Sequence, residues 1–323
     1  KPRKDRYNQL NLRIADGDCR SRSRELDPPF RTKYLPSKRM DSRAFRRFRR
    51  NKGALAGLVL VVAVTALGIV GPWFAPFDPV EQFTDSLLLD NGLPAGPGVS
   101  PGHWLGGDDL ARDELSRLLS GARVSMLVAY LATGLAVLIG VTIGLVSGYV
   151  GGRLDTLMMR LVDIVLSMPF LLIAIVMQRV FDAPGRWTIC IVLGVLSWTT
   201  LARVTRAKTM EARELDYIQA ARALGLRHFR VLARHVLPNV AGPIIAIATI
   251  MVARMIIAES ALSFLGLGVR PPTASWGSML NDSQSLLLGV PRLTLYPAML
   301  ISMAVFGFNL FGEGLRDAFD PKD

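Results

Sequence analysis

Long uncharged stretches alternate with short polar stretches along this chain of 323 residues. Runs that contain no Asp, Glu, Lys or Arg cover residues 53–77, 124–152, 187–202, 236–253 and 293–312. A helix needs about 20 mostly apolar residues to cross a bilayer, so four of these runs are long enough alone and the run at 187–202 needs its flanks. A soluble core can imitate one such run but hardly five. The pattern therefore predicts a polytopic membrane protein.

A sixth apolar segment at 157–177 is the weakest, because it includes Arg160 and Asp163 near its start. Pro169 lies within it and is expected to kink the helix, since proline lacks the amide N–H and its ring clashes with the preceding turn. Charge favours counting this segment as a span, because without it the basic loop at 203–238 falls on the outer side.

Basic residues are concentrated in two segments, which sets the expected orientation. Residues 1–52 hold 18 Lys or Arg against 6 Asp or Glu, and residues 203–238 hold 8 against 3. Residues 76–122 carry 8 acids and only two arginines. Loops that are rich in Lys and Arg stay in the cytoplasm. Six spans satisfy this rule and place both termini and the 203–238 loop inside.

The expected organisation is an all-α chain with six transmembrane helices. It divides into a basic cytoplasmic tail at 1–52, a first span at 53–77, an extracytoplasmic loop with an amphipathic helix at 78–122, five spans at 123–313 that include the cytoplasmic loop at 203–238, and a cytoplasmic tail at 314–323. Within the outer loop, Asp108 and Asp109 are expected to begin a helix, where acidic groups favour the free N–H groups. Residues 1–39 lack periodicity and precede Met40, so an artefactual extension and a genuine disordered tail are both open.

Composition excludes several classes of function. The mean hydropathy is +0.33 and the formal net charge is +12. The basic cluster at 45–52 suits anionic lipid headgroups rather than nucleic acid, because basic flanks beside a first span are ordinary topology signals. Two cysteines and three scattered histidines give no metal-ligand spacing. The sequence has no G-x-x-x-x-G-K-[ST] phosphate loop, no nucleophile elbow and no zinc pair, so we expect no catalytic, cofactor or metal site in this chain.

The polar loop at 216–238 carries a helix–turn–helix pattern. Leu215, Ile218, Ala221 and Leu224 recur at helical spacing before Gly225, and apolar spacing resumes at Phe229. Glycine suits the left-handed position that ends a helix. A helical loop of this kind between two spans indicates that another protein docks on it.

The loop resembles the EAA loop of ABC importer permeases. Ala220-Ala221, Gly225 and Leu237-Pro238 fall at the family's spacing, and Gln219 stands where the family has Glu. The resemblance implies that the loop docks ATPase subunits through Asp216, Tyr217, Gln219, Ala220, Ala221, Leu224, Gly225, Leu226 and Pro238.

Three further segments resemble the dipeptide, oligopeptide and nickel branch of that family. They are LGGDDLARD at 105–113, ESALSFLGLGVRPPTASWG at 259–277 and NLFGEGLRDAFDP at 309–321. The resemblance extends from about residue 45 to residue 321 and indicates the shorter-loop permease of the pair. It implies the type I (MetI-like) importer fold in a bacterial inner membrane.

By the same resemblance, the chain forms half of a peptide pathway. Its partners would be a second related permease, two ATPase subunits that bind ATP and Mg²⁺, an extracytoplasmic substrate-binding protein and membrane lipid. Dipeptides, longer peptides, glutathione-like compounds and nickel chelates remain open as substrates.

Polar residues inside the spans favour a different class of transporter only weakly. Asp163, Arg254 and Glu259 are costly in hydrocarbon. A secondary transporter driven by an ion gradient needs such groups near the midplane, whereas these three are expected near span ends, as structural contacts or pathway residues. Gly140, Gly144 and Gly148 form a small-residue stripe that suits close helix packing.

Overall fold

The computed structural model describes residues 45–181 and 185–319. The chain divides into Lys1–Met40 and a compact unit from Asp41 to Asp323. The expectations about residues 1–39 and Met40 therefore lie outside the described residues. Within the described part of this unit, the regular secondary structure is helical. Three isolated β-bridges lie in the loop before the second long helix.

Among the described residues, five helices are long and apolar enough to cross a membrane, and a bent pair raises the number to six if the pair is one span. They are α3 (Lys52–Val70), α5 (Glu114–Val150), the pair α6 (Gly152–Ser167) and α7 (Phe170–Val180), α8 (Arg186–Arg213), α11 (Leu237–Phe264) and α13 (Arg292–Phe319). This arrangement confirms the all-α membrane fold that the apolar runs predict.

The third span is broken rather than kinked. The axes of α6 and α7 differ by 88°. Met168, between them, is extended at φ −86° and ψ 137°, because a residue before proline avoids the helical region. Pro169 then cannot donate the hydrogen bond that would continue α6. The bend expected at Pro169 is confirmed. Because the change of direction is this large, the apolar segment at 157–177 forms two helices instead of one.

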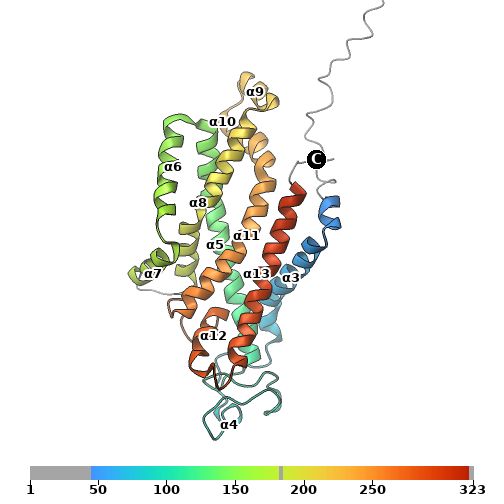
Figure 1. Cartoon of the computed structure of the whole chain (residues 1–323), viewed down its shortest axis with the longest axis vertical. Helices are drawn as coiled ribbons and strands as arrows, with labels where there is room; N and C mark the ends of the chain where they lie inside the picture. Colours follow the sequence, from blue (N-terminus) through green and yellow to red (C-terminus); the bar gives the residue numbers. More distant parts are fainter. Residues whose placement is uncertain (1–44, 182–184, 320–323) are drawn as a thin grey trace, which may run out of the picture. The chain divides into compact units, whose positions relative to one another are not determined.

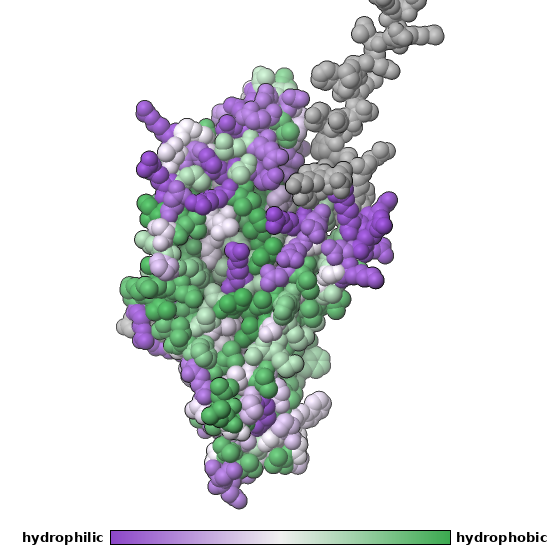
Figure 2. Space-filling model, in the orientation of Figure 1, coloured by the Kyte–Doolittle hydropathy of each residue, from purple (hydrophilic) through white to green (hydrophobic). Residues whose placement is uncertain are grey.

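The two ends of the bundle differ in polarity. One end carries α9 (Asp216–Ala223) and α10 (His228–Val231), and the other carries α4 (Thr84–Leu87) and α12 (Trp276–Asp282) (Figure 1). Apolar residues gather over the middle of the bundle, while hydrophilic residues surround the end with α9 and α10 (Figure 2). Short helical turns complete the described structure: η2 (Gly71–Phe74), the π-helical η3 (Leu232–Val236) and η4 (Gln284–Leu286).

Close helix packing lies along the glycine stripe of α5. A Cβ atom added at Gly140, Gly144 or Gly148 would meet a backbone carbonyl oxygen of α8 at 2.7, 2.6 and 2.6 Å, respectively. By contrast, a Cβ atom at Gly134 would meet nothing within 4 Å. The stripe therefore lets α5 and α8 approach backbone to backbone, as the spacing predicts.

A second small-residue contact joins α3 to α13. Gly314 lies against Ala54, whose exposure is 1%, and a Cβ atom at Gly57 would meet the backbone nitrogen of Phe311 at 2.5 Å. Gly314 belongs to the last turns of α13, which continues to Phe319. The helix therefore continues past residue 314, where the C-terminal tail was expected to begin, and packs against α3 there.

The second span also begins earlier than its uncharged run. Asp113 caps α5, since its Oδ2 atom accepts a hydrogen bond of 2.8 Å from the Ser116 backbone. From Glu114 the helix continues without a break into the span, so the helical segment expected at the end of the 78–122 loop forms the first turns of α5. Asp108 and Asp109 precede the helix and do not start it.

Candidate functional site

The loop between α8 and α11 folds into a helix and a glycine-terminated turn. Asp216 lies in the first turn of α9, where a carboxylate favours the free N–H groups. Gly225 has φ +76°, and the Leu226 N–H reaches back to the Ala221 carbonyl at 3.3 Å. This hydrogen bond closes a left-handed helix end of the kind that glycine permits. The predicted role of Gly225 as a helix stop is confirmed.

One face of α9 is buried against the bundle. Ile218 is 0% exposed and Ala221 is 6% exposed. Ile218 shares a core cluster with Val231 and Val236 from the second half of the loop. Ala221 is therefore largely covered within this chain, and its expected docking role stays a prediction.

The opposite face of the loop is open. Exposed docking residues are Asp216, Gln219, Ala220, Leu224 and Gly225. Leu224 is 83% exposed, and Phe229, where the apolar spacing resumes, is 82% exposed. Two large apolar side chains therefore stand in the open at the polar end of the molecule. The Gln219 amide donates to the Glu214 carbonyl at 3.2 Å, so part of its capacity is used within the loop.

The loop is fastened to the end of α5. The Tyr149 hydroxyl and the His228 Nδ1 atom are 3.1 Å apart, and the Arg222 guanidinium lies 5.6 Å from the centre of the Tyr149 ring. Arg213, at the end of α8, donates to the Gly148 carbonyl at 3.2 Å. A force on the loop therefore reaches both α5 and α8 through direct contacts.

Pro238 is also exposed and stands at the start of α11. Val236, just before it, shares a core cluster with Ile218 of α9. The preceding turn, η3, is widened, because Leu237 donates to the Leu232 carbonyl five residues back. A proline clashes with the carbonyl four residues before it, and a wider turn relieves that clash. Pro238 thus shapes the entry into α11, whereas Tyr217 and Leu226 remain half-buried beside α9.

The three intramembrane polar residues occupy different environments. Asp163 on α6 pairs with Arg203 on α8, and both side chains are exposed. Glu259 is fully buried five residues before the end of α11 and bonds to Ser125 and Ser263. Arg254 lies well inside α11, so the expectation of a place near the span end is wrong for this residue. The structure does not bring the three together.

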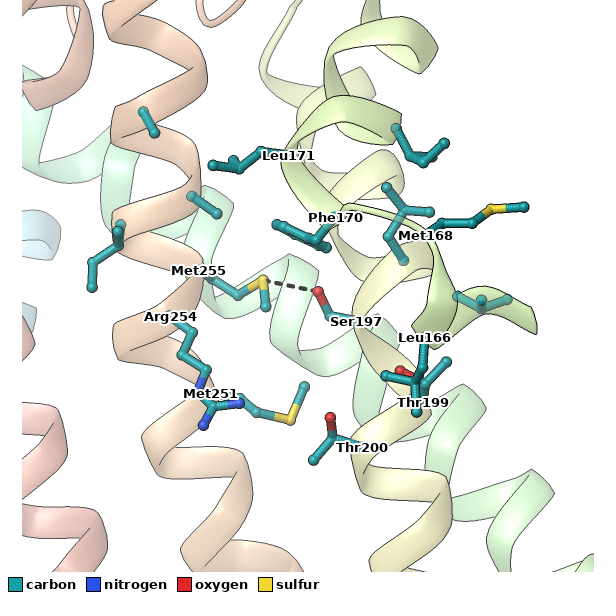
Figure 3. Close-up of a pocket in the computed structure, with 16 residues that line it drawn as sticks. Leu166, Met168, Phe170, Leu171, Ser197, Thr199, Thr200, Met251, Arg254 and Met255 are labelled. Atoms are coloured by element: carbon teal, nitrogen blue, oxygen red, sulfur yellow. Dashed lines mark hydrogen bonds between the residues drawn. The ribbon is translucent and has the colours of Figure 1, made fainter. Parts of the chain in front are cut away.

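Arg254 lines a cavity of about 460 Å³ between the broken third span, α8 and α11 (Figure 3). Its other walls are mostly apolar, with Met251 and Met255 from the same helix. Ser197, Thr199 and Thr200 of α8 contribute hydroxyl groups. The cavity exists because the chain turns sharply at Pro169, which carries Phe170 and Leu171 away from the line of α6. No sequence pattern signalled it.

A buried charge cluster at the other end was also missed. The Asp108 Oδ2 atom lies 2.7 Å from Arg112 Nε and 2.9 Å from Arg117 Nε, and Arg117 also reaches Asp282 at 3.0 Å. Burial and the neighbouring carboxylates raise the pKa of Asp109, and burial raises the pKa of Asp282. The cluster joins the segment before α5 to α12. Paired residues of the cluster are up to 165 positions apart in the chain, so the local sequence does not predict it.

A bundle of membrane helices with an exposed helical loop at one end and an internal cavity is the arrangement of a transport permease. The family model described as "Binding-protein-dependent transport system inner membrane component" matches residues 140–322. A second model, the N-terminal TM domain of oligopeptide transport permease C, matches residues 42–91. The chain belongs to this family of ABC importer permeases.

Individual relatives agree with the family. The chain is 38% identical over 288 residues to the dipeptide transport system permease protein DppC of Bacillus subtilis (strain 168), covering 89% of this chain and 87% of that protein. It is 39% identical over 279 residues to the oligopeptide transport system permease protein OppC of the same organism, covering 86% and 88%. DppC of Escherichia coli (strain K12) is 42% identical over 275 residues, covering 85% and 91%. The resemblance drawn from the motifs is confirmed, and a permease of this kind works with ATPase subunits and a second permease.

Proposed function

We propose that this permease carries dipeptides or oligopeptides and that residues 216–229 form its docking site for an ATPase subunit. The relatives named above, dipeptide and oligopeptide permeases, support the peptide substrate. The observation that carries the docking proposal is the exposure of Leu224 and Phe229, at 83% and 82%. Each gains about 1.5–3 kcal/mol from burial, which a socket on the ATPase supplies.

The loop also has the contacts that a coupling element needs. Tyr149 ties it to α5 through His228 and Arg222. An ATPase that changes shape on binding ATP contacts the loop differently in its two states, and only such a difference shifts the permease between conformations. The two sides of the glycine stripe, α5 and α8, then move together because they lie backbone to backbone.

Orientation and partners follow from the same proposal. The α9 end faces the cytoplasm, where two ATPases hold ATP and Mg²⁺, and this chain binds no cofactor of its own. The end with α4 and α12 faces outward, toward a substrate-binding protein that delivers the peptide. The cationic side chains of Arg46, Arg47, Arg49 and Arg50 lie beside the first span, where they suit anionic lipid headgroups of a bacterial inner membrane.

Paired serine substitutions at the loop tip test the docking role. In the full importer, L224S together with F229S is expected to leave the permease folded in the membrane, to reduce recovery of the ATPases with it and to lower peptide uptake. L288S is the matched control, because Leu288 is 99% exposed between α12 and α13 and a loss there leaves the loop untouched. Full recovery of the ATPases and wild-type uptake with the loop variant would contradict the proposal.

A further inference from the structure

Arg254 is an exposed cation well inside the membrane-spanning helix α11. It lies 17 residues after the start of α11 at Leu237 and ten before its end at Phe264. Ten residues correspond to about 15 Å, half the thickness of the hydrocarbon core. A charge at this depth is costly unless it is paired or faces water or a ligand. Its position therefore requires a compensating group.

No such group is found in the described residues. Arg254 has no hydrogen-bond or ion-pair partner among residues 45–181 and 185–319, whereas Arg203 and Arg206 on the neighbouring helix α8 pair with Asp163 and Asp155. The nearest acid along α11 is Glu259, whose carboxyl group is fully buried and occupied by Ser125 and Ser263. Arg254 is therefore a donor without an acceptor within the described chain.

The Arg254 side chain turns toward Met251 and Thr200, into the cavity (Figure 3). The residues that line this cavity include no Asp or Glu, so its charge is positive. Its volume of about 460 Å³ lies within the range of small-molecule sites. Methionine side chains at Met251 and Met255 adapt to differently shaped partners, and the hydroxyls of Ser197 and Thr200 add polar contacts on the α8 wall.

We propose that Arg254 is an anion-binding residue of the translocation pathway and takes the α-carboxylate of the peptide in transit. This inference rests on the proposed peptide substrate. Every linear peptide ends in a carboxylate whatever its side chains, and a guanidinium binds a carboxylate through two parallel hydrogen bonds. One fixed cation in an adaptable apolar cavity therefore recognises the part that all peptides share and tolerates the part that varies.

Two other anions fit the cavity less well. A lipid phosphate lies at headgroup level, whereas Arg254 is about 15 Å from the nearer end of its helix. A single acidic side chain from the second permease pairs the charge but leaves most of a cavity of about 460 Å³ unfilled. A peptide of two or three residues satisfies both the charge and the space.

Binding to the assembled importer without ATP and without the binding protein tests the inference, since the binding protein's own selectivity then has no influence. The probes are labelled tri-alanine and its C-terminal amide. Wild type is expected to bind the free acid at least about tenfold more tightly than the amide, because hydrogen bonds between charged groups are the strong ones. R254Q is expected to lose this preference by weakening the acid alone, and R254K to keep part of it.

R179Q is the matched control, because Arg179 is an exposed cation of α7 that does not line the cavity, and it is expected to keep the preference. Equal binding of acid and amide by wild type, or an unchanged preference in R254Q, would overturn the inference. Loss of the second permease from R254Q complexes would overturn it in favour of an interchain ion pair. An importer that takes up no peptide at all, while R254Q still lowers affinity for small carboxylates, would instead contradict the proposed substrate.

Discussion

The Ser125 hydroxyl on α5 donates to the Glu259 carboxyl group on α11 at 3.1 Å, although the residues are 134 positions apart. The same hydroxyl accepts the backbone N–H of Trp276 at 3.1 Å, at the start of α12. The Ser263 hydroxyl donates to the other carboxyl oxygen of Glu259 at 2.8 Å. Glu259 thus joins two spans to the short helix α12, and all of these groups are buried.

Replacing Glu259 is expected to loosen this junction. E259L leaves the Ser125 and Ser263 hydroxyls without their acceptor, at a cost of about 1–3 kcal/mol for each buried group. E259Q keeps one acceptor oxygen, so its thermal unfolding temperature is expected between those of wild type and E259L. Unfolding of the purified complex measures the order. Unchanged stability in both variants, together with loss of a proton-gradient dependence that wild-type uptake shows, would instead assign Glu259 to a proton relay.

The contact between α5 and α8 predicts a sharp difference between two glycines of one helix. G144V is expected to prevent stable folding, because its Cβ atom would meet the Ala202 carbonyl oxygen at 2.6 Å and neither backbone can retreat. G134V is expected to be tolerated, since nothing lies within 4 Å of the added atom. The amount of folded permease in membranes and its unfolding temperature report the difference. Equal behaviour of the two variants would contradict the packing of the stripe.

Much of this fold can be predicted from the local sequence. Apolar runs of membrane length predict the spans, and Gly140, Gly144 and Gly148 predict a packing face, because both signals depend on neighbours within one helix. The helix stop at Gly225 is predicted for the same reason, since a left-handed residue satisfies carbonyls only a few positions back. These features need no knowledge of what else the chain contacts.

Features that depend on distant partners were not predictable in this way. Asp108 follows the pattern of a helix start, but its ion pairs with Arg112 and Arg117 hold it in a buried cluster instead. Ala220 and Ala221 are equivalent in the motif, and only the tertiary structure shows that Ala221 is covered. The cavity beside Arg254 arises from the direction that the chain takes after Pro169, which hydropathy does not encode.

The charge cluster of Asp108, Arg112, Arg117 and Asp282 places two adjacent acids, Asp108 and Asp109, in different environments. D108N is expected to lower the unfolding temperature, because breaking a buried pair while Arg112 and Arg117 stay in place costs about 3–5 kcal/mol. D109N is expected to match or exceed wild type at neutral pH, since burial and the repulsion from Asp108 and Asp282 raise the pKa of Asp109 and oppose its charged form.

The pH dependence of this comparison has a definite sign. A carboxyl group whose pKa is raised on folding adds stability below its unfolded value, here 3.8, and that contribution is lost as pH rises through the raised pKa. The advantage of D109N is therefore expected to shrink as the pH falls toward the acid range. Thermal unfolding across this range measures it, and an advantage that grows in acid would contradict the proposed environment of Asp109.

Three substitutions in the loop separate folding from docking. A221W is expected to lower the stability of the permease itself, because Ala221 is 6% exposed and a larger side chain overpacks the contact between α9 and the bundle. A220W is expected to leave the permease folded but to weaken ATPase binding and peptide uptake, since Ala220 lies on the open face.

G225V adds strain of about 1–2 kcal/mol at a left-handed position, although no neighbour lies within 4 Å of the new atom. G225N is its control, because asparagine tolerates that conformation and is expected to retain more activity. Recovery of the ATPases with each variant, beside its unfolding temperature, distinguishes the two effects. If A220W binds the ATPases as wild type does, the open face of α9 is not the docking surface, and the six-span fold stands without that link.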